Sequence, residues 1–223
     1  MKLHNFVVLF GTCIIVITFF VAIAFAKKQK PLYYNYIFAF IILGLLLSTN
    51  TIANHNNAWL LNKKVSIIIE QLIALFQSLM LGLFFHEVLK KSVFTIKIKW
   101  LLFLLIFTEV ILIMVVHLTN TDIRPFLISN LILLICCIFY LRDLMNNKPT
   151  LKLINSSAFW ITIGILFSNC IGSPIYSLMV FIPKNQEYLN LRLQIFSISN
   201  MSLIVLYLFI IKSYLCLKHP QNL

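Results

Sequence analysis

The sequence has very little charge for its length. Only 11% of its 223 residues are charged, and six of those are acidic, whereas 61% are hydrophobic. A soluble domain is about 25% charged and about 45–50% apolar. A soluble chain this apolar would lack the polar surface needed to cover itself, so we expect the lipid bilayer to be its solvent.

Motifs for catalysis or metal binding are also missing. There is no Cys-x-x-Cys, no His-Glu-x-x-His, no pair of aspartates and no nucleophile next to a base. The histidines offer no two helix-core positions at one depth, as haem ligation would need. We therefore expect no enzyme activity, no metal and no cofactor. The five cysteines fall within or at the end of predicted helices, where they serve as small apolar side chains: Cys13, Cys136, Cys137, Cys170 and Cys216.

Long apolar runs dominate what is present. About 20 apolar residues in a helix span the hydrocarbon core, which is about 30 Å thick. Seven such runs predict an all-α, polytopic membrane protein with one seven-helix bundle over 1–223 as its only domain. The expected helices are 5–26, 32–50, 65–89, 98–119, 125–145, 156–182 and 191–214.

The first run raises the alternative of a signal peptide. Lys2 gives a charged start, and Ala24-Phe25-Ala26 resembles a cleavage site. However, the run is long for a signal peptide, and lysines follow it at once. We expect it to be a retained helix.

The net charge of +12 is distributed unevenly between the connections. Twelve of the 18 Lys and Arg residues fall on the side that carries the C-terminus, and six fall on the side of the N-terminus. Because cytoplasmic loops are enriched in Lys and Arg, the N-terminus is expected outside and the C-terminus in the cytoplasm. The basic inner rim favours anionic lipids and does not indicate nucleic-acid binding.

The amino-acid composition indicates the kind of organism from which the sequence comes. Lysine outnumbers arginine, and Ile, Asn and Phe are frequent, as in AT-rich bacterial genomes. We therefore expect the protein in the cytoplasmic (inner) membrane of a bacterium.

Glu109 is the most unusual residue of the fourth run. It lies ten residues from Lys99, which at 1.5 Å per residue is about 15 Å, the depth of the bilayer midplane. An ionised carboxylate there costs at least about 2.5–3.5 kcal/mol. We expect it to be neutral or paired inside the bundle, facing the third, sixth and seventh helices, as a ligand or ion site.

Other polar side chains are expected near the same depth: Gln77, Asn169 and Asn200. With Glu109 they predict an interior polar layer. The alternative is that the amides only join neighbouring helices, through hydrogen bonds worth about 0.6 kcal/mol on average.

Glu70 predicts a second polar position nearer the outer side. Ser66, Glu70 and Gln77 share one helix face, at spacings of four and seven. A cavity open to the outside would include Glu70 and narrow towards Glu109. The alternative places Glu70 at the interface, paired with Lys63 or Lys64.

The sixth run combines small residues with a proline. Gly164, Ser168 and Gly172 recur every four residues, which allows close helix packing, and Pro174 follows. Proline removes a backbone hydrogen bond and kinks a helix. The pattern predicts either a hinge or a static kink.

The segment 157–167, with Phe159-Trp160 and Gly164 four residues after the Trp, resembles a set of small bacterial seven-helix membrane proteins. Those proteins are often encoded beside histidine kinases and have no assigned activity. The resemblance covers the fifth to seventh helices. The family often has Tyr where this chain has Phe167 or Ser168. The resemblance implies a signalling context and no catalytic residues.

Three functions compete at this point. The first is a sensor or receptor-like membrane protein that signals to a cytoplasmic or membrane partner, for which the resemblance implies a histidine kinase. The second is a homo-oligomeric pore, a transporter or a membrane-perturbing effector that uses Glu109. The third is a structural or chaperone subunit of a larger membrane complex.

Overall fold

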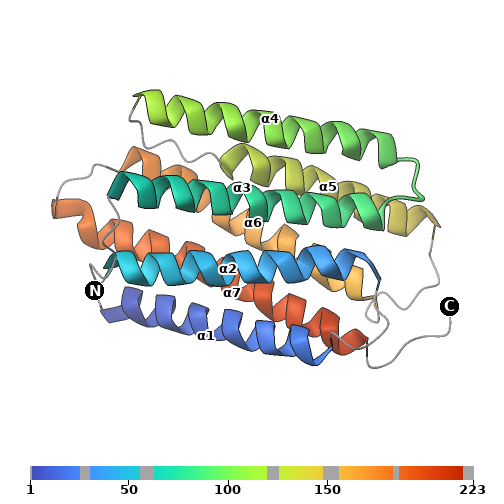
Figure 1. Ribbon diagram of the computed structural model, residues 1–223, viewed down its shortest axis with the longest axis horizontal. Coiled ribbons are helices and arrows are strands. Elements are labelled where there is room, and N and C mark those ends of the chain that lie inside the picture. Colours follow the sequence, from blue (N-terminus) through green and yellow to red (C-terminus); the bar gives the residue numbers. More distant parts are fainter. Residues whose placement is uncertain are drawn as a thin grey trace. The chain divides into compact units, whose positions relative to one another are not determined.

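The protein is described from a computed structural model (Figure 1), over residues 2–25, 31–55, 63–119, 126–147, 156–182 and 186–217. All regular elements within these ranges are helices. They are α1 (Lys2–Ala24), α2 (Tyr33–His55), α3 (Lys63–Val88), α4 (Thr95–Thr119), α5 (Phe126–Asn147), α6 (Ser157–Phe181), the short 3₁₀ helix η2 (Gln186–Tyr188) and α7 (Leu189–Cys216).

Seven of these helices are long and apolar enough to cross a membrane, counted over the described residues. This confirms the predicted all-α class and the number of spans, and the chain is a multi-pass membrane protein. Several helices extend past their predicted bounds. The second was expected to end at Asn50 and ends at His55, because hydropathy locates the apolar part of a helix while backbone hydrogen bonding continues into the interface.

The helices group into two compact units. One unit comprises 1–30 and 130–223, and the other comprises 31–129. The first therefore contains α1, α6, α7 and most of α5, and the second contains α2, α3, α4 and the first residues of α5. A single domain over the whole chain stays a prediction.

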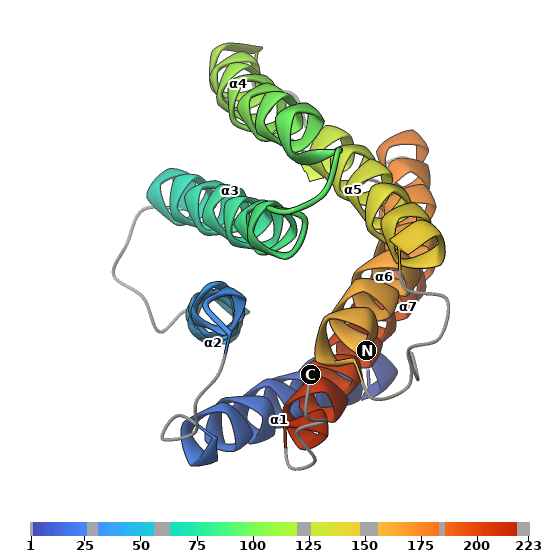
Figure 2. The same cartoon turned by 90° about the vertical axis from the view of Figure 1, so that its right-hand side faces the viewer.

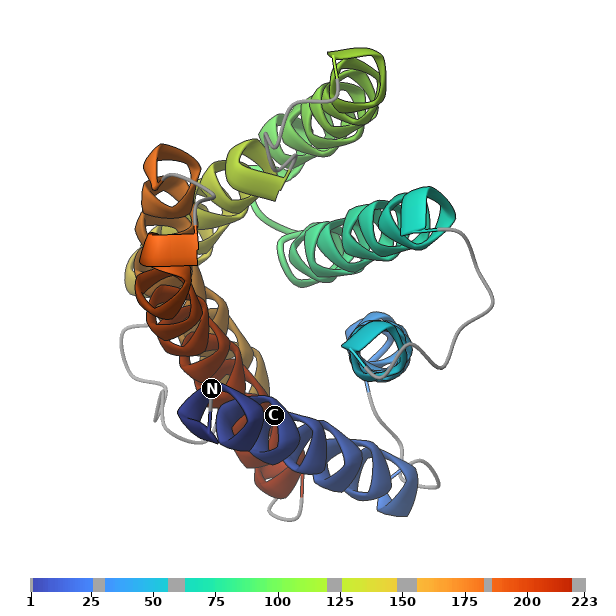
Figure 3. The same cartoon turned by 90° about the vertical axis from the view of Figure 1, so that its left-hand side faces the viewer.

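In the first unit α7 packs against both α1 and α6 (Figure 3). Trp160 of α6 stacks on Phe209 of α7 with ring centroids 5.6 Å apart. Near the opposite end of α6, Gly172 lies close to Ser199 and Ser202 of α7. Residue numbers rise along one helix as they fall along the other, so α6 and α7 are antiparallel neighbours.

The glycine at position 164 makes this packing close. A Cβ atom built there would lie 2.9 Å from Phe209 Cβ and 3.4 Å from the Leu206 carbonyl oxygen. Neither of these atoms is the tip of a flexible side chain. Gly164 thus lies against α7, where only a hydrogen atom fits without a shift of the neighbouring atoms.

In the second unit α3 lies between α2 and α4 (Figure 2). Tyr33 of α2 meets Phe84 of α3 edge to face, with ring centroids 5.5 Å apart. On the α4 side, the Leu102 side chain occupies the space beside Gly82 where a Cβ atom would stand. The small residue thus lets α4 approach α3.

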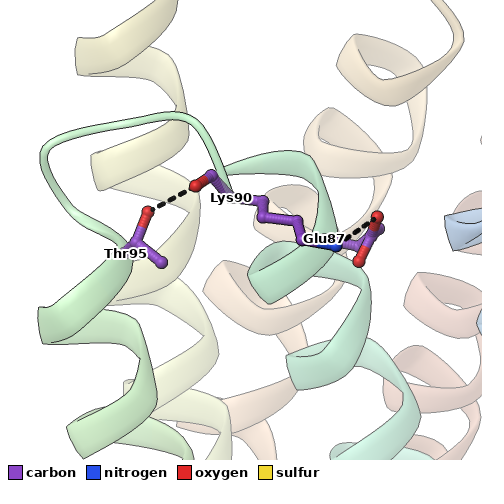
Figure 4. A network of polar contacts seen from close by, with 3 residues as sticks. All are labelled: Glu87, Lys90 and Thr95. Carbon is purple, nitrogen blue, oxygen red and sulfur yellow. Dashed lines mark hydrogen bonds and ion pairs between the residues drawn. The ribbon is translucent and has the colours of Figure 1, made fainter.

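The turn between α3 and α4 is held by its own polar groups (Figure 4). The Thr95 hydroxyl lies 2.7 Å from the Leu89 carbonyl oxygen, 2.7 Å from that of Ser92 and 3.1 Å from that of Lys90. The Lys90 ammonium lies 3.6 Å from the Glu87 carboxylate. The Thr95 hydroxyl thus donates within a turn whose Leu89 and Ser92 carbonyl oxygens also accept from the backbone N–H groups of Ser92 and Thr95.

Replacing Gly164 by Ala tests the close approach of α6 and α7. The new methyl group must push α7 away, so we expect the free energy of unfolding in detergent to fall by about 1–3 kcal/mol. Gly11→Ala is the matched control, because its Cβ would meet only Ile204 at 3.6 Å, an ordinary contact. Equal stability of the two variants would contradict this account of the packing.

Candidate functional site

Most of α4 is exposed, but its one acidic residue is buried. Phe103 and Phe107 are 62% and 54% exposed, and Met114 is 59% exposed. Apolar side chains like these suit contact with lipid. Glu109 is only 1% exposed, so the helix is rotated to place its carboxyl group among protein atoms.

Two serine side chains bind the Glu109 carboxyl group. Ser78 Oγ of α3 lies 3.0 Å from Glu109 Oε1, and the Ser129 side chain at the start of α5 also forms a hydrogen bond with the carboxyl group. Ser78 and Ser129 are themselves buried. A single carboxyl group therefore joins residues of α3, α4 and α5 inside a membrane-spanning region.

The Ser78 hydroxyl has two neighbours but only one proton to donate. Its oxygen lies 2.8 Å from the Ala74 carbonyl oxygen and 3.0 Å from Glu109 Oε1. If the proton is donated to Ala74, the Glu109 bond requires a protonated carboxyl group as the donor. If Glu109 is ionised, Ser78 must turn its proton to the carboxylate. The arrangement can thus hold a proton in one of two hydrogen-bonding patterns.

The sequence of α3 explains why Ser78 faces α4. Ala74, Ser78 and Gly82 recur every four residues and so lie along one face. Gly82 receives Leu102 of α4, and Ser78 reaches Glu109 of the same helix. Small residues at this spacing bring two helix backbones together, which lets a short serine side chain reach across.

Gln77, which was predicted to share a polar layer with Glu109, does not lie on this face of α3. It precedes Ser78 and is half-buried. Adjacent residues in an α-helix are about 100° apart around the axis. The contact of Glu109 with α3 therefore uses Ser78, and a role for Gln77 stays a prediction.

Glu70 of α3 forms a hydrogen bond with a residue of α2. Asn50 Nδ2 of α2 donates to Glu70 Oε1 at 3.0 Å, and Asn50 is buried whereas Glu70 is half-buried. This bond joins α2 to α3. The alternative pairing with Lys63 or Lys64 involves side chains outside the described ones.

Asn169 and Asn200 belong to the other unit. Asn169 lies on α6 and is buried, and Asn200 lies on α7 and is half-buried. Among the predicted site residues, Glu70, Gln77 and Glu109 therefore share one unit, while Asn169 and Asn200 share the other. A single polar layer containing all of them stays a prediction.

Sequence reasoning missed Ser78 and Ser129. It selected larger polar residues, among them Gln77, which directly precedes Ser78 in the sequence. The small-residue repeat of α3 was the available signal for Ser78. Within the described side chains, no group of three or more His, Cys, Asp or Glu residues is placed to hold a metal ion.

A double-mutant cycle tests the bond between α3 and α4. We expect Ser78→Ala to lower the free energy of unfolding by about 1 kcal/mol in the wild-type background and by much less in Glu109→Met. The expected coupling is about 0.6–1.7 kcal/mol.

Ser48→Ala serves as the control for this cycle, because the Ser48 hydroxyl donates to the Gly44 carbonyl of its own helix at 2.9 Å. We expect its effect to be the same with and without Glu109. Strictly additive effects of Ser78→Ala and Glu109→Met would show that the two side chains do not interact.

Comparisons with known protein families, with curated proteins and with solved structures found no match for this chain.

Proposed function

We propose that the protein is a sensor or receptor-like membrane protein that signals to a protein partner. The observation that carries the proposal is the buried Glu109 carboxyl group, which hydrogen-bonds Ser78 and Ser129. A carboxyl group at this position links three spans through bonds that depend on its proton. Any stimulus that adds or removes the proton of the carboxyl group changes how the spans pack. A stimulus that separates the two serines from the carboxyl group has the same effect.

The proposed signal passes along α3 and α4 to the turn that joins them. Both helices contact the Glu109 site, Ser78 on α3 and Glu109 itself on α4. The turn at their ends is held firmly by the Thr95 hydroxyl. A relative movement of the two helices is therefore transmitted to the turn instead of being lost in a flexible loop.

The exposed side chains of this turn suit a partner surface. Lys90 and Lys91 are exposed, Val93 is 90% exposed and Ile96 is 70% exposed. Cations beside exposed apolar side chains match an acidic, amphipathic protein surface or the anionic membrane interface. With the N-terminus outside, the turn lies in the cytoplasm, and we place the protein in a bacterial cytoplasmic membrane. A histidine kinase is the partner class that the sequence resemblance favours.

One observation favours a second function, transport. Glu109 is an ionisable side chain within a span, and such residues often mark ion or proton pathways. Glu70 lies 39 positions earlier in the chain, on α3, which also carries Ser78. A pore, transporter or membrane-perturbing effector would carry protons or cations between these carboxyl groups.

Site-specific photo-cross-linking in the native membrane tests the sensor proposal. We expect a photoreactive residue at Val93 to form a defined adduct with a partner protein. The same residue at Phe103, which is exposed in the middle of α4, should label mainly lipid. Glu109→Gln should change the adduct yield at position 93 several-fold, whereas Ser48→Ala should leave it unchanged.

Two results would contradict the sensor proposal. One is an adduct at position 93 whose yield is the same in the wild-type protein and in Glu109→Gln. The other is a proton or cation flux in proteoliposomes that wild-type protein supports and Glu109→Gln abolishes, which would replace the sensor by the transport function.

A further inference from the structure

Most buried Ser and Thr hydroxyl groups of α6 and α7 donate a hydrogen bond to a backbone carbonyl of their own helix. Each of the following donates to a carbonyl oxygen three or four residues earlier, at 2.7–2.9 Å: Thr162, Ser177, Ser197, Ser202 and Ser213. This is the usual solution for Ser and Thr in apolar helices.

Three polar atoms of α6 and α7 depart from this pattern. Within the described part of the chain, Asn169 Nδ2, Ser173 Oγ and Ser199 Oγ are buried and have no hydrogen-bond partner in the protein. Ser199 is 0% exposed and Asn169 is 9% exposed. A buried polar group without a partner costs about 1–3 kcal/mol, so these three require an explanation.

One of these groups, Ser199 Oγ, faces Gly172 of α6. A Cβ atom at position 172 would lie 3.9 Å from Ser199 Oγ and 3.1 Å from Ser202 Oγ, both on α7. The other two groups belong to residues that precede and follow this glycine in the sequence of α6, Asn169 and Ser173. The Ser199 hydroxyl is therefore directed at α6, at a position where α6 has no side chain. We call Asn169, Gly172, Ser173, Ser199 and Ser202 the α6–α7 seam.

We propose that the α6–α7 seam binds internal water. A buried water molecule typically makes about three hydrogen bonds to polar groups that are otherwise unsatisfied. Asn169 Nδ2 can only donate, and the two hydroxyls can donate or accept. Water both accepts and donates, so it can satisfy each of these groups.

The chemistry of the seam favours water over an ion. The Asn169, Ser173, Ser199 and Ser202 side chains are all neutral, so they offer no charge to balance a cation inside a membrane. This site is distinct from Glu109 and does not depend on the proposed signalling function.

Water-edited solid-state NMR of the full chain in lipid bilayers tests the proposal. Magnetisation from water should reach Ser199 and the Asn169 side chain several times faster than it reaches Ser213. Ser213 is the matched reference, because it is also 0% exposed on α7 but donates to the Ile210 carbonyl oxygen at 2.7 Å. This comparison needs no variant and so does not depend on how a mutant folds.

Gly172→Ala gives a second test, because its methyl group would fill the space against the two α7 hydroxyls. We expect it to slow the transfer from water to Ser199, while Gly11→Ala leaves the transfer unchanged. Transfer to Ser199 as slow as to Ser213 in the wild-type protein would show that the seam is dry and would overturn the proposal.

Discussion

The structure depends on the rule that polar groups inside a membrane must be satisfied by the protein or by water bound within it. Lipid tails offer no hydrogen bonds, so each unpaired polar group costs several kcal/mol in hydrocarbon. Glu109 is the most demanding case, since it is the only acidic residue of α4. Its burial to 1% exposure and its bonds to Ser78 and Ser129 follow from this constraint. The need to give Glu109 these partners fixes the rotation of α4 about its axis and its contact with α3. It leaves the apolar side chains of α4 facing outward.

The same rule distinguishes two kinds of polar group in the spans. Hydroxyls that donate to their own helix, as Ser48 does to Gly44, place no demand on neighbouring helices. An ionised carboxylate cannot do this because it has no proton to donate, and Glu70 instead accepts from Asn50 of another helix. These long-range bonds are therefore where a change in protonation or hydration can alter helix packing, which is why the proposed function rests on Glu109.

The sequence predicted the helices well and the contacts of the site less well. Apolar runs about 20 residues long determine the spans, because the thickness of the bilayer sets their length. The burial of Glu109 follows from the cost of exposing a carboxyl group to lipid. Its partners do not follow, because a side chain as small as Ser78 contacts another helix only when the backbones are close. That closeness depends on Gly82 and Leu102, a tertiary contact that a count of polar residues does not include.

The most direct test of this account is the reaction of Glu109 with dicyclohexylcarbodiimide in intact membranes. This apolar reagent dissolves in the bilayer and modifies protonated carboxyl groups that face lipid. The account predicts that Glu109 stays unmodified in the folded protein and reacts once the helices are separated in denaturing detergent. Rapid modification in the intact membrane, read by mass spectrometry of the α4 peptide, would mean that the carboxyl group faces lipid and would contradict the account.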